Sequence, residues 1–397
     1  MTAAGAPRRV VVALGTAQTL AWASSYYLPA VLAEPVAAGL GVSRVFFFGA
    51  FSAALLLMGM VGPAIGRHID THGGRNVLVA SNLVLAAGLV ALASAQGPAS
   101  LSLAWVVLGA GMALGLYETA FSTLAHLYGA RARLPITGIT LMAGFASTVG
   151  WPLTAALEHA LGWRGACLCW AAMHLVLGVP LNALGLPRRA ASRATDAGAA
   201  APPIQRAEVD ATAHAGRRSM VIVAGVFAAV SYVSTAMAAH LPGLLQATGA
   251  TAAVAIAAAS LVGPAQVAAR FAEFAVARRF APHPLAPARV AAALHPVGVG
   301  LLALVGGSGI GAVAFALLHG AGNGMMTIAR GTLPLALFGA EGYGFRQGAI
   351  SAASRIVQAA APVSFGLLLD AGGAPAALAL SAGLSLAALL ALFALRR

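Results

Sequence analysis

The sequence predicts an all-α integral membrane protein, with twelve transmembrane helices in two pseudo-symmetric six-helix bundles. Of its 397 residues, 60% are hydrophobic and only 8% are charged, and the mean hydropathy is +0.88. Soluble domains carry about 25% charged residues, so a soluble enzyme is excluded. Each membrane span takes about 20 apolar residues, and the chain has room for about twelve spans of that length.

Apolar runs bounded by charged and turn-forming residues define the expected spans. They do not alternate polar and apolar residues as the strands of a membrane barrel do. The expected helices are Val10–Leu32, Val45–Ala64, Val77–Ala95, Leu101–Leu127, Ile136–Leu157, Ala166–Leu186, Met220–Leu245, Thr251–Val276, Val290–Val305, Ile310–Phe338, Phe345–Leu369 and Ala376–Leu395.

One long polar stretch divides the chain. It is rich in Ala, Pro, Arg and Thr and has no apolar period, which is typical of a flexible linker. The predicted domains are an N-terminal six-helix bundle (1–186), a cytoplasmic linker (187–218) and a C-terminal six-helix bundle (219–397).

An internal repeat supports this division. Several glycines and prolines recur 210 residues apart, so helices four and five recur as helices ten and eleven. The pattern indicates two parallel halves, an architecture in which substrates bind at the midplane between them. The repeated pairs are Gly129 and Gly339, Gly138 and Gly348, Pro152 and Pro362, and Gly162 and Gly372.

The basic residues predict the orientation. A net charge of +13 would suggest nucleic acid as a partner of a soluble protein. Here all 23 basic residues are Arg, and 18 of them fall on one side of the predicted spans, while Arg44 and Arg164 fall on the other. This positive-inside pattern places both termini in the cytoplasm. We expect a multi-pass protein of the cytoplasmic (inner) membrane of a bacterium and no nucleic-acid partner.

Five arginine or glutamate residues lie within the predicted spans, away from the span ends. Each costs at least about 2.5–3.5 kcal/mol to insert into a membrane, so each should face a cavity or a partner. They are Glu118, Arg270, Glu273, Arg330 and Arg355.

Arg270 and Arg355 are the candidate substrate-binding residues. The guanidinium of Arg270, one turn after Gln266, can bind a carboxylate through two hydrogen bonds, or it could pair with Glu273 three residues on. Arg355 shares a polar helical face with Gln358. It could contact substrate or make a structural bond between helices. Two cations facing one cavity favour a small anion with one or two carboxylates.

Glu118 and Arg330 are candidate gating residues. The repeat places them at similar depths in helices four and ten, and Arg330 continues a polar stripe that includes Asn323. They could form a charge pair that breaks as the halves rock, or a static pair. Glu118 or Glu273 could instead carry a coupling proton.

The loop after the second span carries a motif. It reads Gly62-Pro63-Ala64-Ile65-Gly66-Arg67-His68-Ile69-Asp70-Thr71-His72-Gly73-Gly74-Arg75. This resembles the signature loop of the major facilitator superfamily, although Thr71 and Gly74 stand where basic residues are usual. The resemblance implies that Asp70, with Arg75 in the same loop, belongs to the gate, and that Asp70 caps a neighbouring helix end and latches an outward-open state.

Helix eight resembles one branch of that superfamily more closely. Its run from Gln266 to Arg270 is similar to that of the monocarboxylate and oxalate/formate-type organic anion transporters, although Gln266 stands where an acidic residue is usual. The resemblance implies that Arg270 pairs with a substrate carboxylate, with Arg355 as a second cation. It also implies that helices one, four, seven and ten line the cavity. Gln18, Trp22 and Tyr26 on helix one would then be wall residues, or the aromatic ones could be interface anchors.

We therefore expect a secondary active transporter of a small organic anion that works by alternating access. No phosphate-binding Gly-Lys loop and no nucleophile–base spacing occurs in the sequence, so we expect no enzyme activity and no cofactor. The expected partners of the monomer are the lipid bilayer and a small-molecule substrate, with a coupling proton or an exchanged anion. Alternatives are an exporter of an uncharged or cationic compound, a receptor of transporter-like fold, and a soft-metal (copper) importer using Met237, His240, His319, Met325 and Met326.

Overall fold

The computed structural model describes residues 8–187, 206–280, 282–306 and 308–395, and every regular element in these ranges is helical. We call α1 to α9 the first bundle. Its elements are α1 (Arg8–Ser24), α2 (Pro29–Leu40), α3 (Arg44–His72), α4 (Arg75–Ala93), α5 (Pro98–Gly115), α6 (Tyr117–Tyr128), the 3-10 turn η1 (Gly129–Ala132), α7 (Arg133–Ala143), α8 (Ala146–Met173), the π-helical η2 (His174–Gly178) and α9 (Val179–Gly185).

The remaining helices form the second bundle. Its first helix begins at Arg206, so its first turns extend into the segment predicted as a linker, and residues 188–205 of that segment lie outside the described residues. The helices are α10 (Arg206–Ala247), α11 (Ala252–Ser260), α12 (Val262–Phe280), α13 (Leu285–Val305), α14 (Gly309–Phe338) and α15 (Tyr343–Ala394).

Several spans are joined without a loop. Eight continuous helical stretches among the described residues are long and apolar enough to cross a membrane, and the stretches 98–185 and 343–394 hold 88 and 52 residues. Each is longer than the about 20 residues of one span. Within them the chain reverses at Gly162 (φ 70°) and Gly373 (φ 67°), in a backbone region that favours glycine. With α1 and α2 as the first span, the chain makes the twelve predicted crossings.

The first span is longer and more bent than predicted. Its helix stops at Ser24 and resumes at Pro29, because proline has no N–H to continue the hydrogen-bond ladder but fits the first turn of a new helix. The predicted end at Leu32 is wrong, since α2 continues to Leu40 and ends at Gly41 (φ 63°). Glu34, within α2, lies in an exposed ion pair with Arg44 at 3.1 Å.

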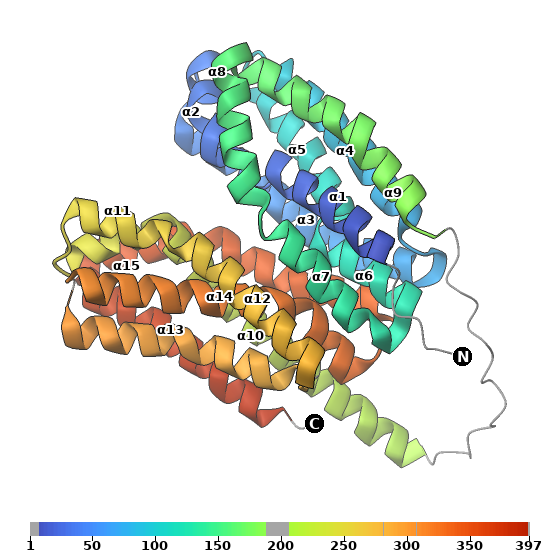
Figure 1. The fold of residues 1–397 in the computed structure, drawn as a ribbon, viewed down its shortest axis with the longest axis vertical. Helices are drawn as coiled ribbons and strands as arrows, with labels where there is room; N and C mark the ends of the chain where they lie inside the picture. The colour runs from blue at the N-terminus through green and yellow to red at the C-terminus, as the bar shows by residue number, and fades with distance from the viewer. Residues whose placement is uncertain (1–7, 188–205, 281, 307, 396–397) are drawn as a thin grey trace.

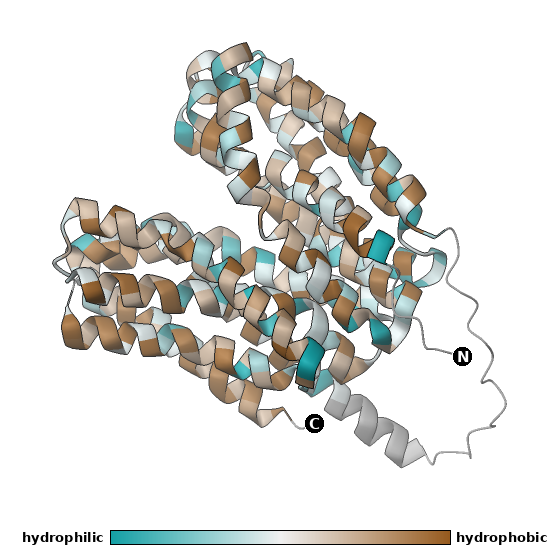
Figure 2. Ribbon diagram, in the orientation of Figure 1, coloured by the Kyte–Doolittle hydropathy of each residue, from teal (hydrophilic) through white to brown (hydrophobic). Residues whose placement is uncertain are grey.

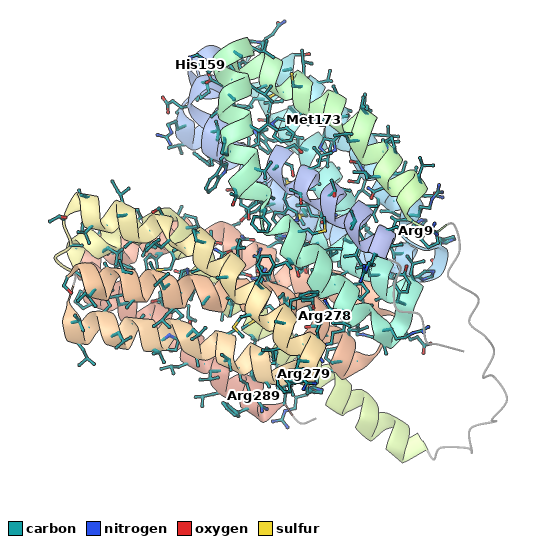
Figure 3. All side chains as sticks on the ribbon, viewed as in Figure 1. Arg9, His159, Met173, Arg278, Arg279 and Arg289 are labelled. Atoms are coloured by element: carbon teal, nitrogen blue, oxygen red, sulfur yellow. The ribbon has the colours of Figure 1, made fainter. Side chains whose placement is uncertain are left out.

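The two bundles converge at one end and separate toward the other (Figure 1). We call the converging end, where Arg8, Arg75, Arg133, Arg278 and Arg346 lie, the basic end, and the opposite one the far end. The main contacts between bundles join α3 and α6 to α15, and α7 to α12 and α14. Figure 3 labels arginines toward the basic end and His159 at the far end. Hydrophobic residues run along both bundles (Figure 2), and many large ones are exposed, as a lipid-facing surface requires.

Bare backbone forms the contact between α3 and α15. A Cβ added to Gly66 would overlap the carbonyl group of Gly344, and one added to Gly348 would lie 2.5 Å from the carbonyl oxygen of Gly62. Small residues allow helix backbones to approach this closely, as in other membrane helix pairs. The glycines of the signature loop therefore shape the surface along which the two bundles meet.

Gly66→Ala should lower the melting temperature of the detergent-solubilised protein by several degrees. The added methyl group overpacks the contact between α3 and α15, which costs about 1–3 kcal/mol. Gly225→Ala on α10 is the control, because its Cβ would meet open space and alanine is the better helix former by roughly 0.5–1 kcal/mol. Equal melting temperatures of the Gly66→Ala and wild-type proteins would contradict the close approach.

Candidate functional site

Asp70 joins the two bundles at the basic end. Its Oδ1 accepts a hydrogen bond from the backbone N–H of Gly344 (2.7 Å), and its Oδ2 accepts one from Phe345 (2.9 Å). These donors belong to the first turn of α15, where backbone N–H groups have no partner within the helix. A carboxylate at such an N-terminus is stabilised by about 0.3–1 kcal/mol. Asp70 therefore caps a helix of the other bundle.

Arg75, also predicted in the gate, makes its contact inside the first bundle. Its Nε donates to the carbonyl oxygen of Ala183 at 3.0 Å, and its Nη2 donates to the same oxygen. This fork ties the start of α4 to α9. Arg75 therefore braces the first bundle behind Asp70 and does not itself reach the second bundle.

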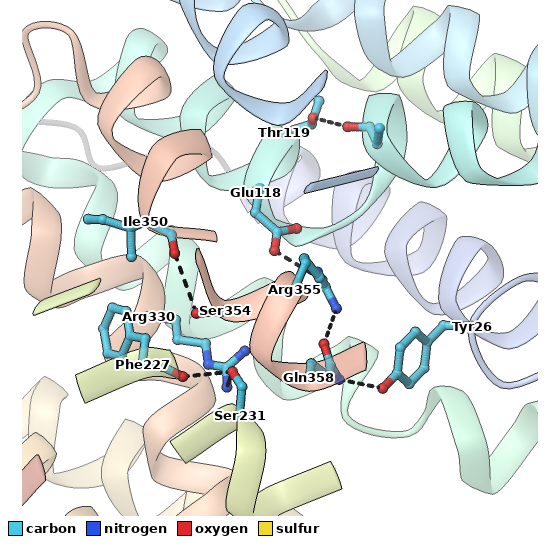
Figure 4. Close-up of polar contacts among 11 residues, drawn as sticks. Tyr26, Glu118, Thr119, Phe227, Ser231, Arg330, Ile350, Ser354, Arg355 and Gln358 are labelled. Carbon is cyan, nitrogen blue, oxygen red and sulfur yellow. Dashed lines mark hydrogen bonds and ion pairs between the residues drawn. The ribbon is translucent and has the colours of Figure 1, made fainter. Parts of the chain in front are cut away.

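An ion pair between bundles lies deeper in the molecule (Figure 4). Arg355 Nη2 on α15 lies 3.1 Å from Glu118 Oε1 on α6. Arg355 Nη1 donates to Gln358 Oε1 (3.0 Å), and Gln358 Nε2 donates to the hydroxyl of Tyr26 (3.0 Å). We call these four residues the interbundle chain. Glu118 and Arg355 also line a cleft between the bundles, together with Met58, Gly59 and Thr119.

Glu118 and Arg330 are not paired in this structure. Arg330 Nη2 donates to Ser231 Oγ on α10 at 2.8 Å, within its own bundle. The repeat relates the positions of the two residues along their helices, but the direction of each side chain depends on helix rotation, which the spacing does not determine. Arg355 on α15 is instead the partner of Glu118 on α6.

The predicted alternative pair of Arg270 with Glu273 is also not formed. Within the described ranges the ion pairs join Arg44 to Glu34 and Arg355 to Glu118. Arg270 is only 6% exposed, and its donors reach Gly324 O (3.4 Å), Gln266 Oε1 (3.4 Å) and Thr327 Oγ1 (3.3 Å). These are long bonds to neutral acceptors. The guanidinium is therefore buried without a carboxylate partner.

Arg270 lies where the bundles meet. Its Nη1 occupies the space beside the backbone of Gly144, at the end of α7 in the first bundle. Glu273, one turn further along α12, is 8% exposed, and Arg133 begins α7, the helix of the first bundle that packs against α12. The Oε2 of Glu273 is buried and has no hydrogen-bond partner. The α7–α12 contact thus carries one acidic and two basic side chains.

Two other candidates point away from these residues. Gln18 is 1% exposed and donates to the carbonyl oxygen of Gly115 at 2.6 Å, which joins α1 to α5 inside the first bundle. Asn323 lines a separate cavity inside the second bundle, beside His295 and His319. The Nδ1 atoms of these two histidines lie 2.9 Å apart.

The residues named for a soft metal do not gather in one place. His240 Nε2 contacts the carbonyl oxygen of Pro362 (2.8 Å), while His319 pairs with His295. In the part of the chain that the structure describes, no three His, Cys, Asp or Glu residues are grouped as metal ligands.

Sequence reasoning did not predict the contacts of three residues at the junction. Gln358 was recognised only as a member of the Arg355 stripe, although its spacing of three residues places it beside Arg355. Ser231 lies in the seventh predicted span, which the resemblance implies lines the cavity, but it was not predicted as the partner of Arg330. Nothing in the sequence singled out Tyr117, next to Glu118. Tyr117 became visible only through its ring contact with Trp22, whose centroid lies 4.7 Å away.

Solved structures resemble this arrangement over nearly its whole length. The E. coli fucose:proton symporter FucP aligns with a TM-score of 0.72 and 15% identity, covering 98% of each chain. The human organic anion transporter MFSD10 aligns at 0.67 and 16%, covering 97% of this chain and 99% of the other. The proton:xylose symporter XylE aligns at 0.69 and 13%, covering 96% and 94%.

The chain has the major facilitator superfamily fold. A second solved structure of FucP, described as being in the outward conformation, aligns with a TM-score of 0.73 and 15% identity and covers 98% of this chain and 99% of that one. These identities show the fold alone. The predicted fold class is thereby confirmed.

Sequence comparison adds little about activity. No protein-family model matches the chain. An uncharacterized 38 kDa protein in the 23S RNA operon of Thermoproteus tenax is 30% identical over 154 residues, which cover 39% of this chain and 40% of that protein.

Asp70→Asn should shift the protein away from the state that is closed at the basic end, by about two- to fivefold in population. The amide keeps only one acceptor and loses the charge that the N-terminus of α15 stabilises. Solvent labelling of a cysteine placed at Ser351, which lines the cleft, measures the shift in a protein whose two free cysteines, Cys167 and Cys169, are replaced by serine. Asp370→Asn, an exposed site on α15 outside this contact, should leave labelling unchanged.

A double-mutant cycle tests the ion pair between bundles. Glu118→Gln and Arg355→Gln should each lower the melting temperature, because each leaves an unpaired charge near the junction. The double variant should lose less than the sum of the two losses. The same cycle with Arg330→Gln in place of Arg355→Gln should show a smaller coupling energy. A larger one would restore the pair predicted from the repeat.

Proposed function

We propose that this protein is a secondary active transporter that moves a small organic anion across the membrane by alternating access. The observation that carries this proposal is Arg270, a buried guanidinium without a carboxylate at the junction of two bundles. A buried charge is costly unless it is paired. A substrate carboxylate that accepts two charge-assisted hydrogen bonds would supply that pairing.

The charges around the junction favour an anion. Of Arg270, Arg330 and Arg355, only Arg355 is paired with a carboxylate, that of Glu118, while Arg270 and Arg330 have neutral acceptors. Since Arg355 is already paired, Arg270 is the first-choice substrate residue, with Gln266 and Thr327 beside it. The names of the proteins with similar structures include two sugar symporters and one organic anion transporter. The preference for an anion therefore rests on this chain's own arginines.

The transport cycle follows from the contacts between bundles. We propose that residues 1–186 and 219–397 rock as two bodies joined by 187–218, and that Asp70 of α3, which caps α15, holds the basic end closed. Opening of that end would break the Asp70 cap and separate α7 from α12. A proton on a carboxylate or an exchanged anion would supply the driving gradient.

The distribution of arginine supports the proposed location. With the basic end in the cytoplasm, the positive-inside rule is satisfied, and the far end, where the bundles separate, would face the outside. The protein would act as a monomer in the cytoplasmic membrane of a bacterium, with both termini in the cytoplasm.

Arg270→Gln should abolish anion binding and transport while leaving the folded protein in place. Glutamine keeps hydrogen-bond donors but has no charge to pair with a carboxylate. Binding is measured by thermal stabilisation of the purified protein, since a ligand of the native state raises its melting temperature by mass action. Transport is measured by counterflow in liposomes.

Arg278→Gln is the matched control. Arg278 is exposed at the basic end and lies over the ring of Phe274, so its variant should bind and transport normally. Stabilisation of the wild type by neutral or cationic compounds alone would overturn the proposal in favour of an exporter. Binding without counterflow would favour a receptor.

A further inference from the structure

We propose that the anion is an aromatic monocarboxylate, with its carboxylate on Arg270 and its ring against a wall of aromatic side chains in the first bundle. This inference rests on the proposed function and names the substrate class of the same site. Three features of the junction support it: a group of neighbouring rings, one unpartnered donor among them, and the contact of Arg270 with Gly144 beside them.

The aromatic wall is continuous. The ring centroid of Trp22 lies 4.7 Å from that of Tyr117, 5.1 Å from Tyr26 and 6.0 Å from Tyr27. Tyr27 extends the wall to Trp151 on α8, at 5.9 Å. Tyr26, Tyr27 and Tyr117 are half-buried. These rings come from three different spans of the first bundle, so they are brought together by the fold and not by one helix.

Arg270 approaches this wall from the second bundle. Its guanidinium lies against Gly144, where any side chain would displace it. Ala143 and Ala146, on either side of Gly144, pack in the same hydrophobic cluster as Trp22, and Tyr27 and Tyr117 pack against that cluster. The cation and the rings therefore belong to the same junction between the bundles.

One donor in the wall has no acceptor. The Nε1–H of Trp22 is buried and without a hydrogen-bond partner, although an indole nitrogen can only donate. A buried N–H group without a hydrogen-bond partner destabilises a folded protein. An acceptor that arrives with the substrate, such as a carboxylate oxygen, would satisfy it together with Arg270.

The wall also limits the ligand. Aromatic rings prefer edge-to-face or offset stacking on other rings and gain from it beyond the burial of surface, so a flat ring fits better than a saturated one. The residues that form the wall carry no cation, and Arg355 is already neutralised by Glu118. A second carboxylate on the substrate would therefore meet tyrosine and tryptophan rings without a counter-ion.

The test compares four probes with the purified full-length protein by calorimetry and thermal stabilisation. They are benzoate, cyclohexanecarboxylate of similar size and charge, succinate with two carboxylates, and neutral benzamide. We expect benzoate to bind about tenfold more tightly than cyclohexanecarboxylate, which is the factor that about 1.4 kcal/mol represents. Succinate should bind more weakly than benzoate, and benzamide should not bind.

Variants locate the ring. Tyr117→Leu should reduce the preference for benzoate over cyclohexanecarboxylate to near unity, while both still require Arg270. Trp22→Phe keeps a ring but removes the N–H donor, and should weaken both carboxylates about equally. Phe393→Leu, an exposed ring outside the wall, is the control and should change neither.

The outcomes separate the two proposals. If cyclohexanecarboxylate or succinate binds as tightly as benzoate, and Arg270→Gln removes that binding, the aromatic inference is overturned and the anion transporter stands. If none of the carboxylates binds, the proposed function itself fails. Should Tyr117→Leu not fold, the comparison of the four probes on the wild type still decides the inference.

Discussion

A buried charge needs a counter-charge, and this constraint determines much of the junction between the bundles. Glu118 and Arg355, from different bundles, neutralise each other at 3.1 Å. Arg330 donates to the neutral Ser231 Oγ at 2.8 Å, and the buried Oε2 of Glu273 has no hydrogen-bond partner. Arg270 has only neutral acceptors too, and all of its bonds are 3.3 Å or longer. The proposed site therefore lies where the compensation of buried charge is weakest.

Composition and periodicity were sufficient to predict the fold. The membrane constrains the whole chain in the same way. Its effect is visible in the sequence as apolar runs of span length, a repeat of glycine and proline, and an arginine-rich side. The repeat is visible in the backbone: Gly129 and Gly339 both have positive φ (55° and 73°). The other chain reversal shifts by one residue, from the expected Gly372 to Gly373. Helix ends were less predictable, because glutamate and proline are tolerated near an exposed end such as that of α2.

The partners of side chains could not be predicted in the same way. The position of a residue along a span can be predicted from the sequence. The ionisable residues selected in this way included Glu118 and Arg355, which meet at the junction. The direction of a side chain depends on how its helix is rotated against its neighbours. Arg330 and Arg355 illustrate this: both were at a suitable depth for Glu118, but only Arg355 faces it. The aromatic wall was harder to predict from the sequence than these pairs, because Tyr117 and Trp151 come from spans far from Trp22 in the sequence.

The glycine contact between α3 and α15 has a mechanical consequence. Gly62, Gly66, Gly344 and Gly348 bring two smooth backbones together without interlocking side chains. In most helix pairs the side-chain ridges of one helix fill the grooves of the other, so one helix cannot move along the other without repacking its side chains. A contact of bare backbone has few such side chains to repack, so α3 and α15 can change their relative orientation while they stay in close contact.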